Sequence, residues 1–150
     1  LRPIFVKVAP DLSLEALDDV LDVVRAERLA GIIASNTTVR GDLKAKYGEH
    51  WQTEAGGLSG ADPEFRRLST EQIAHIFQQT QGQMSIIGVG GVSDAVSALE
   101  KIRAGASLVQ VVTAIRGEGP GVACHINRGI LNWMEREGVQ NIREVVGIGE

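Results

Sequence analysis

The chain has 150 residues, 43% of them hydrophobic, and this length and composition suit one folded domain rather than a disordered chain. Its 18 glycines, set against three Phe, two Trp and one Tyr, favour an α/β protein with tight turns. The formal net charge of −4, without any stripe of Lys and Arg interleaved with aromatic residues, argues against a nucleic-acid partner. One cysteine excludes a disulfide framework. No apolar stretch reaches the roughly 18 residues of a membrane span, so we expect a soluble chain.

Four short apolar runs predict β-strands, at residues 4–8 (IFVKV), 31–35 (GIIAS), 85–90 (SIIGVG) and 107–112 (SLVQVV). The runs are almost continuously apolar, which is typical of parallel strands that other layers cover. The sequence begins without Met and enters the first run within three residues, so we expect a fragment of a longer protein.

Amphipathic patterns between and after these runs predict helices. Ser13 precedes the first helix, and Ser69 opens the second as a Ser-x-x-Gln capping box. Ser93 caps the third helix, which stops at Gly105, and the last helix ends near Gly138. The residues expected to face the core are Leu14, Leu17, Leu21, Val24, Ile73, Ile76, Phe77, Val96, Leu99, Ile102, Ile126, Ile130 and Met134.

The alternation of strands and helices predicts an α/β fold with a parallel sheet and right-handed crossovers. Four βα units form either an open sheet or half of a (β/α)8 TIM barrel. The GVGG turn followed closely by LVQVVTAI favours the barrel, because the last two strands of such barrels often build a phosphate site. We therefore expect residues 1–150 to be a single domain, the C-terminal half of a barrel. Residues 39–68 lack periodicity, which indicates a functional or disordered loop.

Lys7 lies inside the first apolar run, where alternation places it on the same face as Phe5. A lysine there is costly unless an anion or hydrogen-bond acceptors meet it. It either reaches water at the end of the strand or supplies a cation at the barrel mouth that stabilises negative charge on a ligand.

Small polar residues follow the second strand, in the segment SNTT at 35–38. Barrel enzymes hold ligands at this end of their strands, and Asn36 offers both a donor and an acceptor, which suits an amide or ureide edge. A turn with an N-cap explains the segment equally well. The GGLSG segment at 56–60 either lets the backbone approach a ligand closely or forms a flexible turn.

Gly90 and Gly91 end the third strand just before a helix, an arrangement that exposes N–H groups to a phosphate. Residues 111–113 end the next strand and are placed to close the same cup, so the two loops together favour a phosphate site more than either alone. The three histidines show no metal-ligand spacing, so we expect no metal site. No Ser-His-Asp or Cys-His arrangement is evident either.

The segments VKVAPDLS, SNTT, GGLSG, IIGVGG and EKIRAGASLVQ, in this order, resemble the C-terminal half of dihydroorotate dehydrogenase of class 2, the quinone-linked kind. The resemblance implies strands 5–8 of an FMN-containing barrel. It also implies oxidation of dihydroorotate to orotate with FMN as hydride acceptor, reoxidation by a membrane quinone, and a place in de novo pyrimidine synthesis. The parent protein would then sit peripherally on the cytoplasmic side of the inner membrane.

The same resemblance implies roles for individual residues. The cofactor-binding residues would be Lys7, Ser35, Gly60, Gly90, Gly91, Val112 and Thr113, and the substrate-binding residues would be Asn36 and Thr37. Val112 stands where the family commonly has Tyr, which removes a side-chain contact and leaves the backbone N–H. The family's general base is a serine in the N-terminal half, which neither Ser35 nor Ser59 matches, so this chain alone is expected to be inactive.

Two other interpretations stay open at this point. One is another flavin or phosphate barrel, such as a class 1 dihydroorotate dehydrogenase or a dihydrouridine synthase, although the acidic net charge disfavours a tRNA-binding surface. The other is a non-catalytic fragment that binds phosphate weakly or self-associates. Half a barrel has two open strand edges, and open edges tend to pair, so we expect a homodimer of the half-barrel.

Overall fold

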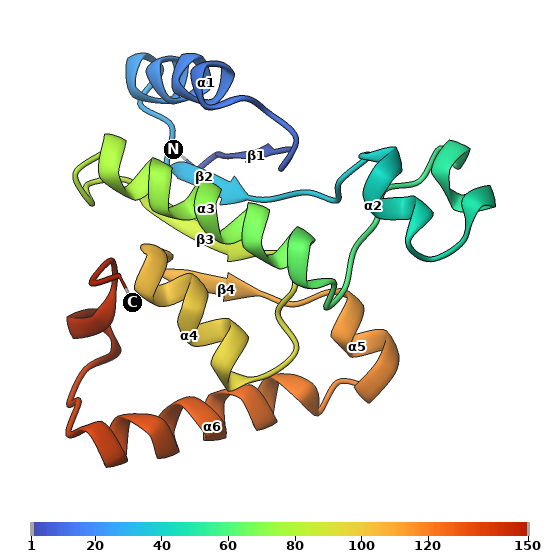
Figure 1. Ribbon diagram of the computed structural model, residues 1–150. Helices are drawn as coiled ribbons and strands as arrows, with labels where there is room; N and C mark the ends of the chain where they lie inside the picture. Colours follow the sequence, from blue (N-terminus) through green and yellow to red (C-terminus); the bar gives the residue numbers. More distant parts are fainter. Residues whose placement is uncertain (1, 150) are drawn as a thin grey trace.

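Four parallel strands form one sheet in chain order, β1-β2-β3-β4, in the computed structural model, which describes residues 2–149. The strands are β1 (Phe5–Val8), β2 (Gly31–Ala34), β3 (Ser85–Val89) and β4 (Leu108–Gln110). All of them point the same way, so their carboxyl ends meet at one edge of the molecule (Figure 1). The predicted parallel sheet is confirmed.

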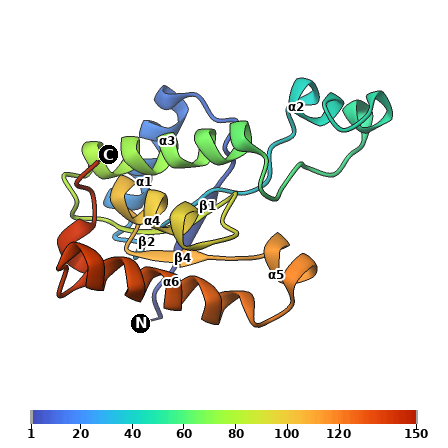
Figure 2. The ribbon, with the colours of Figure 1, turned by 60° about the horizontal axis from the view of Figure 1, so that its bottom comes forward.

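Helices connect consecutive strands and cover one face of the sheet (Figures 1 and 2). The helices are α1 (Leu14–Ala26), α2 (Gly41–Ala45), α3 (Pro63–Gln79), α4 (Ala95–Ala104), α5 (Thr113–Glu118) and α6 (Val122–Glu137). Two 3-10 helices, Glu49–Thr53 and Ile142–Val145, complete the described elements. In the part that the structure covers, no helix is both long and apolar enough to cross a membrane.

The core lies between the sheet and its covering helices. Alternate strand residues, among them Val8, Ile32 and Ile86, are buried against α1 and α3, as alternation of side chains along a strand requires. On the opposite face, Ile33 is half-buried and Leu108 is 64% exposed. A second cluster packs α4 against α6. The sheet therefore has one covered face and one open face.

The start of α3 differs from the sequence prediction. The helix begins at Pro63, and the carboxylate of Asp62 caps it by accepting the N–H of Phe65 at 2.8 Å. Ser69 is buried in the middle of the helix, where its hydroxyl donates to the Val89 carbonyl at 2.6 Å. The expected capping box was wrong because Ser69 fastens the helix to β3 instead.

Helix α4 also begins one residue later than predicted. Asp94, rather than Ser93, is the N-cap, and it forms a capping box with Ser97. The predicted stop at Gly105 and the predicted end of α6 at Gly138 are confirmed. Two residues expected to face the core, Leu14 and Val96, are exposed instead, and each lies in the first turn of its helix.

Residues 39–68 are not a featureless loop. They contain α2, the 3-10 helix Glu49–Thr53 and the first turn and more of α3. The segment between residues 39 and 58 projects from the carboxyl end of the sheet, and we call it the arm (Figures 1 and 2). The ε-amino group of the buried Lys44 donates to the Glu54 carbonyl and closes the arm on itself.

Candidate functional site

A cleft of about 150 Å³ lies at the carboxyl end of the sheet. It collects the ends of all four strands, the last residues of the loop that returns from the arm, and the first turn of α3. The residues given cofactor or substrate roles from the sequence all line it: Lys7, Ser35, Asn36, Thr37, Gly60, Gly90, Gly91, Val112 and Thr113. Val111, which was also expected in the phosphate cup, packs instead against the α4–α6 cluster. The lining residues not singled out are Ser59, Phe65, Val89, Val92 and Gln110.

Lys7 projects from β1 into this cleft and is exposed to solvent. Of the described residues that line the cleft, Lys7 alone carries a charge. The surrounding groups are hydroxyls, amides and backbone, which solvate an ion without neutralising it. The cleft therefore has a net positive charge and suits an anionic ligand.

The segment Ser35–Thr37 is held on both sides by neighbouring strands. The Ser35 N–H donates to the Val89 carbonyl at 2.8 Å, and the Asn36 N–H donates to the Val8 carbonyl at 2.7 Å. The peptide bond between Ala34 and Ser35 is cis. Ser35 is 2% exposed, whereas the Asn36 side chain is exposed and lines the cleft. Asn36 is thus fixed through its backbone while its amide is free to meet a ligand.

The Gly90–Gly91 turn has room for no side chain. Both residues have positive φ, 119° and 74°. A Cβ on Gly91 would lie 2.5 Å from the Cβ of Arg66, and a Cβ on Gly90 would lie 2.9 Å from the Ser69 hydroxyl. The turn is therefore seated directly on α3, and only glycine satisfies both the backbone conformation and the packing.

Backbone N–H groups at this turn are available for an anion. Within residues 2–149, the N–H groups of Gly90, Gly91 and Thr113 donate to no other backbone carbonyl. Oriented N–H groups without acceptors, grouped beside a lysine, form an anion-binding concavity. A phosphate group fits the chemistry of this donor set.

The loop that returns from the arm closes the cleft on one side. Thr38 and Leu58 form an antiparallel bridge, and the Ser59 hydroxyl lies 2.9 Å from the Thr113 hydroxyl. Thr113 was expected at the end of a strand, but it is the first residue of α5 because β4 already ends at Gln110. Ser59 was missed as a lining residue, although its place between Leu58 and Gly60 in GGLSG was the available signal.

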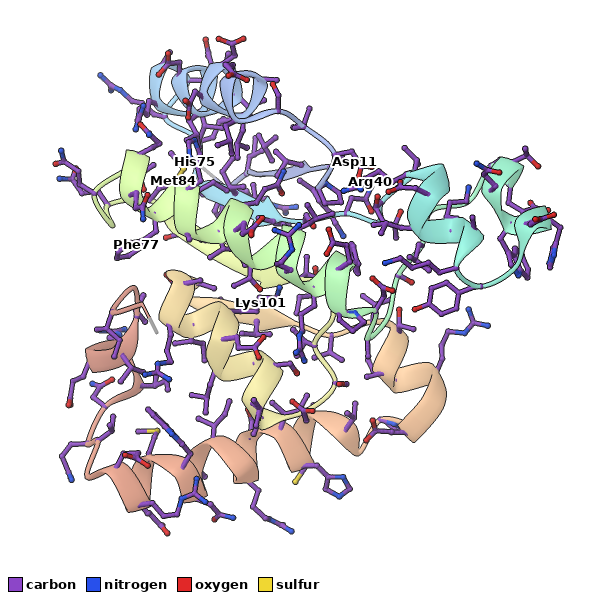
Figure 3. All side chains as sticks on the ribbon, viewed as in Figure 1. Asp11, Arg40, His75, Phe77, Met84 and Lys101 are labelled. Atoms are coloured by element: carbon purple, nitrogen blue, oxygen red, sulfur yellow. The ribbon has the colours of Figure 1, made fainter. Side chains whose placement is uncertain are left out.

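Beneath the cleft, α3 and α4 are joined by a buried amine (Figure 3). Lys101 on α4 is 0% exposed, and its Nζ donates to the Arg66 carbonyl at 2.9 Å and to the Thr70 hydroxyl at 2.7 Å. Burial lowers the pKa of Lys101 to about 7, although the nearby Glu100 opposes this shift. Because Arg66 also packs on Gly91, the amine supports the floor of the cleft.

Comparison with known proteins agrees with this geometry. Residues 1–134 match the family model described as dihydroorotate dehydrogenase. The chain belongs to this family. It is 49% identical to the dihydroorotate dehydrogenase (quinone) of Nostoc punctiforme over 98% of its length, and 47% identical to that of Acaryochloris marina over 97%. In each case it spans 40% of the relative, so the chain covers well under half of the curated relatives.

Solved structures of the dihydroorotate dehydrogenase family have the same fold. The crystal structure of DHODH from Eimeria tenella in complex with ferulenol has a TM-score of 0.83 and 35% identity to this chain, and it matches 97% of this chain and 38% of that one. The ligand-free structure from the same organism also has a TM-score of 0.83. The predicted fold class, four βα units that match part of a TIM barrel, is confirmed, as is the predicted resemblance to the quinone-linked class.

Proposed function

We propose that this chain forms the FMN-phosphate site and part of the substrate site of a quinone-linked dihydroorotate dehydrogenase, as strands 5–8 of its barrel. One observation supports the proposal most strongly. Residues selected from separate segments of the sequence line a single cleft, and that cleft has one lysine and a cluster of N–H groups without backbone acceptors. This donor set suits the phosphate and the electron-rich ring of FMN.

We assign the cofactor-binding roles according to the chemistry of each group. The N–H groups of Gly90, Gly91 and Thr113, together with the Thr113 hydroxyl, would hold the phosphate. Val112 would add its backbone N–H to the same group. When bound, FMN supplies the hydride-accepting chemistry. The remaining cofactor-binding residues in this proposal are Lys7, Ser35 and Gly60.

Lys7 would provide a fixed positive charge near the flavin ring. Its ammonium would favour the ring when negative charge develops on it, because the cleft holds no carboxylate among its described lining residues to cancel that charge. Ser35 and Gly60, which line the cleft from two different loops, would also contact the cofactor.

Asn36 and Thr37 would recognise the substrate. Dihydroorotate presents amide donors and acceptors along its ring, and the Asn36 side chain offers both complementary kinds of group. Its backbone is anchored to Val8, so the amide is presented without a further loss of backbone freedom on binding.

We further propose that the general base lies outside these 150 residues. The hydroxyls of the two serines in the cleft already have protein partners: Ser35 donates to the Asn36 carbonyl at 3.2 Å, and Ser59 lies against the Thr113 hydroxyl. Among residues 2–149, neither serine is paired with a histidine or a carboxylate that would accept its proton. Electron transfer to a quinone and a peripheral membrane location also belong to this proposal, and they rest on the quinone-linked relatives.

An FMN titration of the full-length protein, followed by flavin fluorescence, tests the proposal. We expect saturable quenching, and we expect Lys7→Met to weaken binding by about tenfold because it removes the single charge found among the described residues that line the cleft. Lys46→Met is the matched control, since Lys46 is exposed on the arm and lies outside the cleft. Absence of FMN binding by the wild-type protein would refute the assignment.

For the 150-residue chain on its own, we propose self-association. Within the described sheet, β1 and β4 each pair on one side only, and Leu108 is exposed on the open face. Because all strands are parallel, a second copy turned about the barrel axis would set its β1 beside β4 and close the sheet. Light scattering across concentrations distinguishes the dimer from a monomer of 16.0 kDa, and a monomer at every concentration would reject the idea.

A further inference from the structure

The last residue of β1 and the segment that follows this strand hold the two ends of the Asn36–Thr37 pair. Upstream, the Asn36 N–H donates to the Val8 carbonyl at 2.7 Å. Downstream, the Asp11 carboxylate accepts two hydrogen bonds, from the Thr38 hydroxyl at 2.5 Å and from the Val39 N–H at 2.8 Å. Asp11 lies where the carboxyl ends of β1 and β2 meet the base of the arm (Figure 3).

Thr38 connects Asp11 by hydrogen bonds to the base of the arm and to the loop that returns from it. Its side chain is 0% exposed, and its hydroxyl accepts the Arg40 N–H at 3.2 Å while donating to Asp11. Its backbone exchanges two hydrogen bonds with Leu58, at 3.1 and 2.8 Å. Because a hydroxyl has a single proton, the carboxylate fixes which way that proton points and leaves the lone pairs for Arg40.

The carboxylate is chemically suited to this place. Two donors, one O–H and one N–H, converge on its two separate oxygens. An asparagine side chain has only one acceptor oxygen, so it would satisfy one donor and direct its own NH₂ group at the other. Asp11 itself lies outside the lining of the cleft, so it has no direct contact with a ligand there.

We propose that Asp11 is a positioning residue for substrate recognition, acting through Thr38 to set the orientation of Asn36 and Thr37. The inference rests on the proposed function in one respect, namely that Asn36 and Thr37 contact dihydroorotate or orotate. The proposed phosphate contacts are separate, because the Gly90–Gly91 turn is seated on Phe65, Arg66 and Ser69 of α3 and not on the Asp11–Thr38 pair.

The test compares Asp11→Asn with wild type in the full-length protein, with the Kd of orotate and the Kd of FMN measured independently. We expect orotate binding to weaken by about tenfold, the effect of losing one hydrogen bond to a charged group, with the Kd of FMN unchanged. Asp19→Asn is the control, since it removes the same charge from the exposed face of α1.

A double variant tests the route through Thr38. Thr38→Val removes the hydroxyl donor, after which the single oxygen of an asparagine at position 11 suffices for the Val39 N–H. Adding Asp11→Asn to Thr38→Val should therefore weaken orotate binding by much less than tenfold further.

The outcomes separate the two proposals. If the wild-type protein binds FMN and orotate and Asp11→Asn binds both equally well, the positioning role is wrong and the proposed function stands. Equal losses of FMN and orotate affinity in Asp11→Asn would also overturn the role, since they indicate a general structural effect. If the wild-type protein binds neither ligand, the proposed function fails, and this inference fails with it.

Discussion

Replacing Lys101 with methionine should change how the stability of the protein depends on pH. The amine is buried between α3 and α4 and donates to the Arg66 carbonyl and the Thr70 hydroxyl. These two acceptors match the two N–H groups of a neutral amine, whereas an ammonium has a third donor. The fold therefore favours the neutral form, in agreement with a pKa lowered by burial to about 7.

The size of the effect follows from the difference between the folded and unfolded pKa values of Lys101. In the unfolded chain the pKa is 10.5, so between pH 10.5 and about 7 the unfolded chain binds a proton that the folded chain does not. Stability therefore falls as the pH drops through this window, by about 1.4 kcal/mol per unit and about 5 kcal/mol in all, and is constant below it. Losing two hydrogen bonds costs the methionine variant about 2 kcal/mol. We expect the variant to be about 3 kcal/mol more stable at pH 7.

Urea unfolding of wild type and Lys101→Met, followed by circular dichroism from pH 6 to pH 10, measures this difference. The gain in the free energy of unfolding should shrink steadily above pH 7 and reverse near the top of the range. Lys46→Met, which alters an exposed lysine, should show no such trend. A stability difference that is flat across the range would refute the reasoning, because it would mean that Lys101 is charged and solvated in the fold.

Three further predictions concern the supports of the cleft. Gly91→Ala should cost about 1–3 kcal/mol in urea unfolding and weaken FMN binding, since the turn has φ of +74° and abuts Arg66; unchanged stability would show that the turn can move. Ser69→Ala should cost about 1 kcal/mol by the same assay, because the Val89 carbonyl loses one of its two donors and keeps the Ser35 N–H; a neutral result would contradict the bond from Ser69. Asp94→Ala should cost about 1 kcal/mol. The Ser97 N–H lowers the pKa of Asp94, so this cap stabilises the fold above the unfolded pKa and is lost as the pH falls through the lowered value; an acid unfolding curve identical to that of wild type would argue against it.

The sheet was predictable because buried parallel strands leave a strong local signal, short runs of Ile and Val bounded by glycine or polar residues. Helix ends at Gly105 and Gly138 were predictable for a similar reason, since a glycine with positive φ ends a helix by local geometry alone. The start of α3 was not predicted, although Asp62-Pro63 is a strong start signal. The capping pattern at Ser69 was a second candidate for the helix start. The choice between the two starts depends on a tertiary contact, the hydrogen bond from Ser69 to Val89.

The members of the site were predictable because parallel strands bring their carboxyl ends to one edge, so residues after each strand must meet. The contacts that hold these site residues in place could not be predicted from the sequence pattern. Asp11 and Thr38 are 27 residues apart in the chain, and Ser59 and Thr113 are 54 apart. These contacts depend on how the arm folds back, and no periodicity in the arm encodes that path.

The order of the strands has a consequence for how the protein folds. Each strand pairs with the one before it in the chain, so the sheet can grow by adding one βα unit at a time onto an edge that already exists. The step from β2 to β3 spans the arm and α3, and it closes the longest loop between paired strands. Since loop closure opposes pairing before contacts form, docking of β3 is the expected bottleneck of folding. During synthesis, β1, α1 and β2 emerge before α3, whose Ile73 and Ile76 complete the core above them.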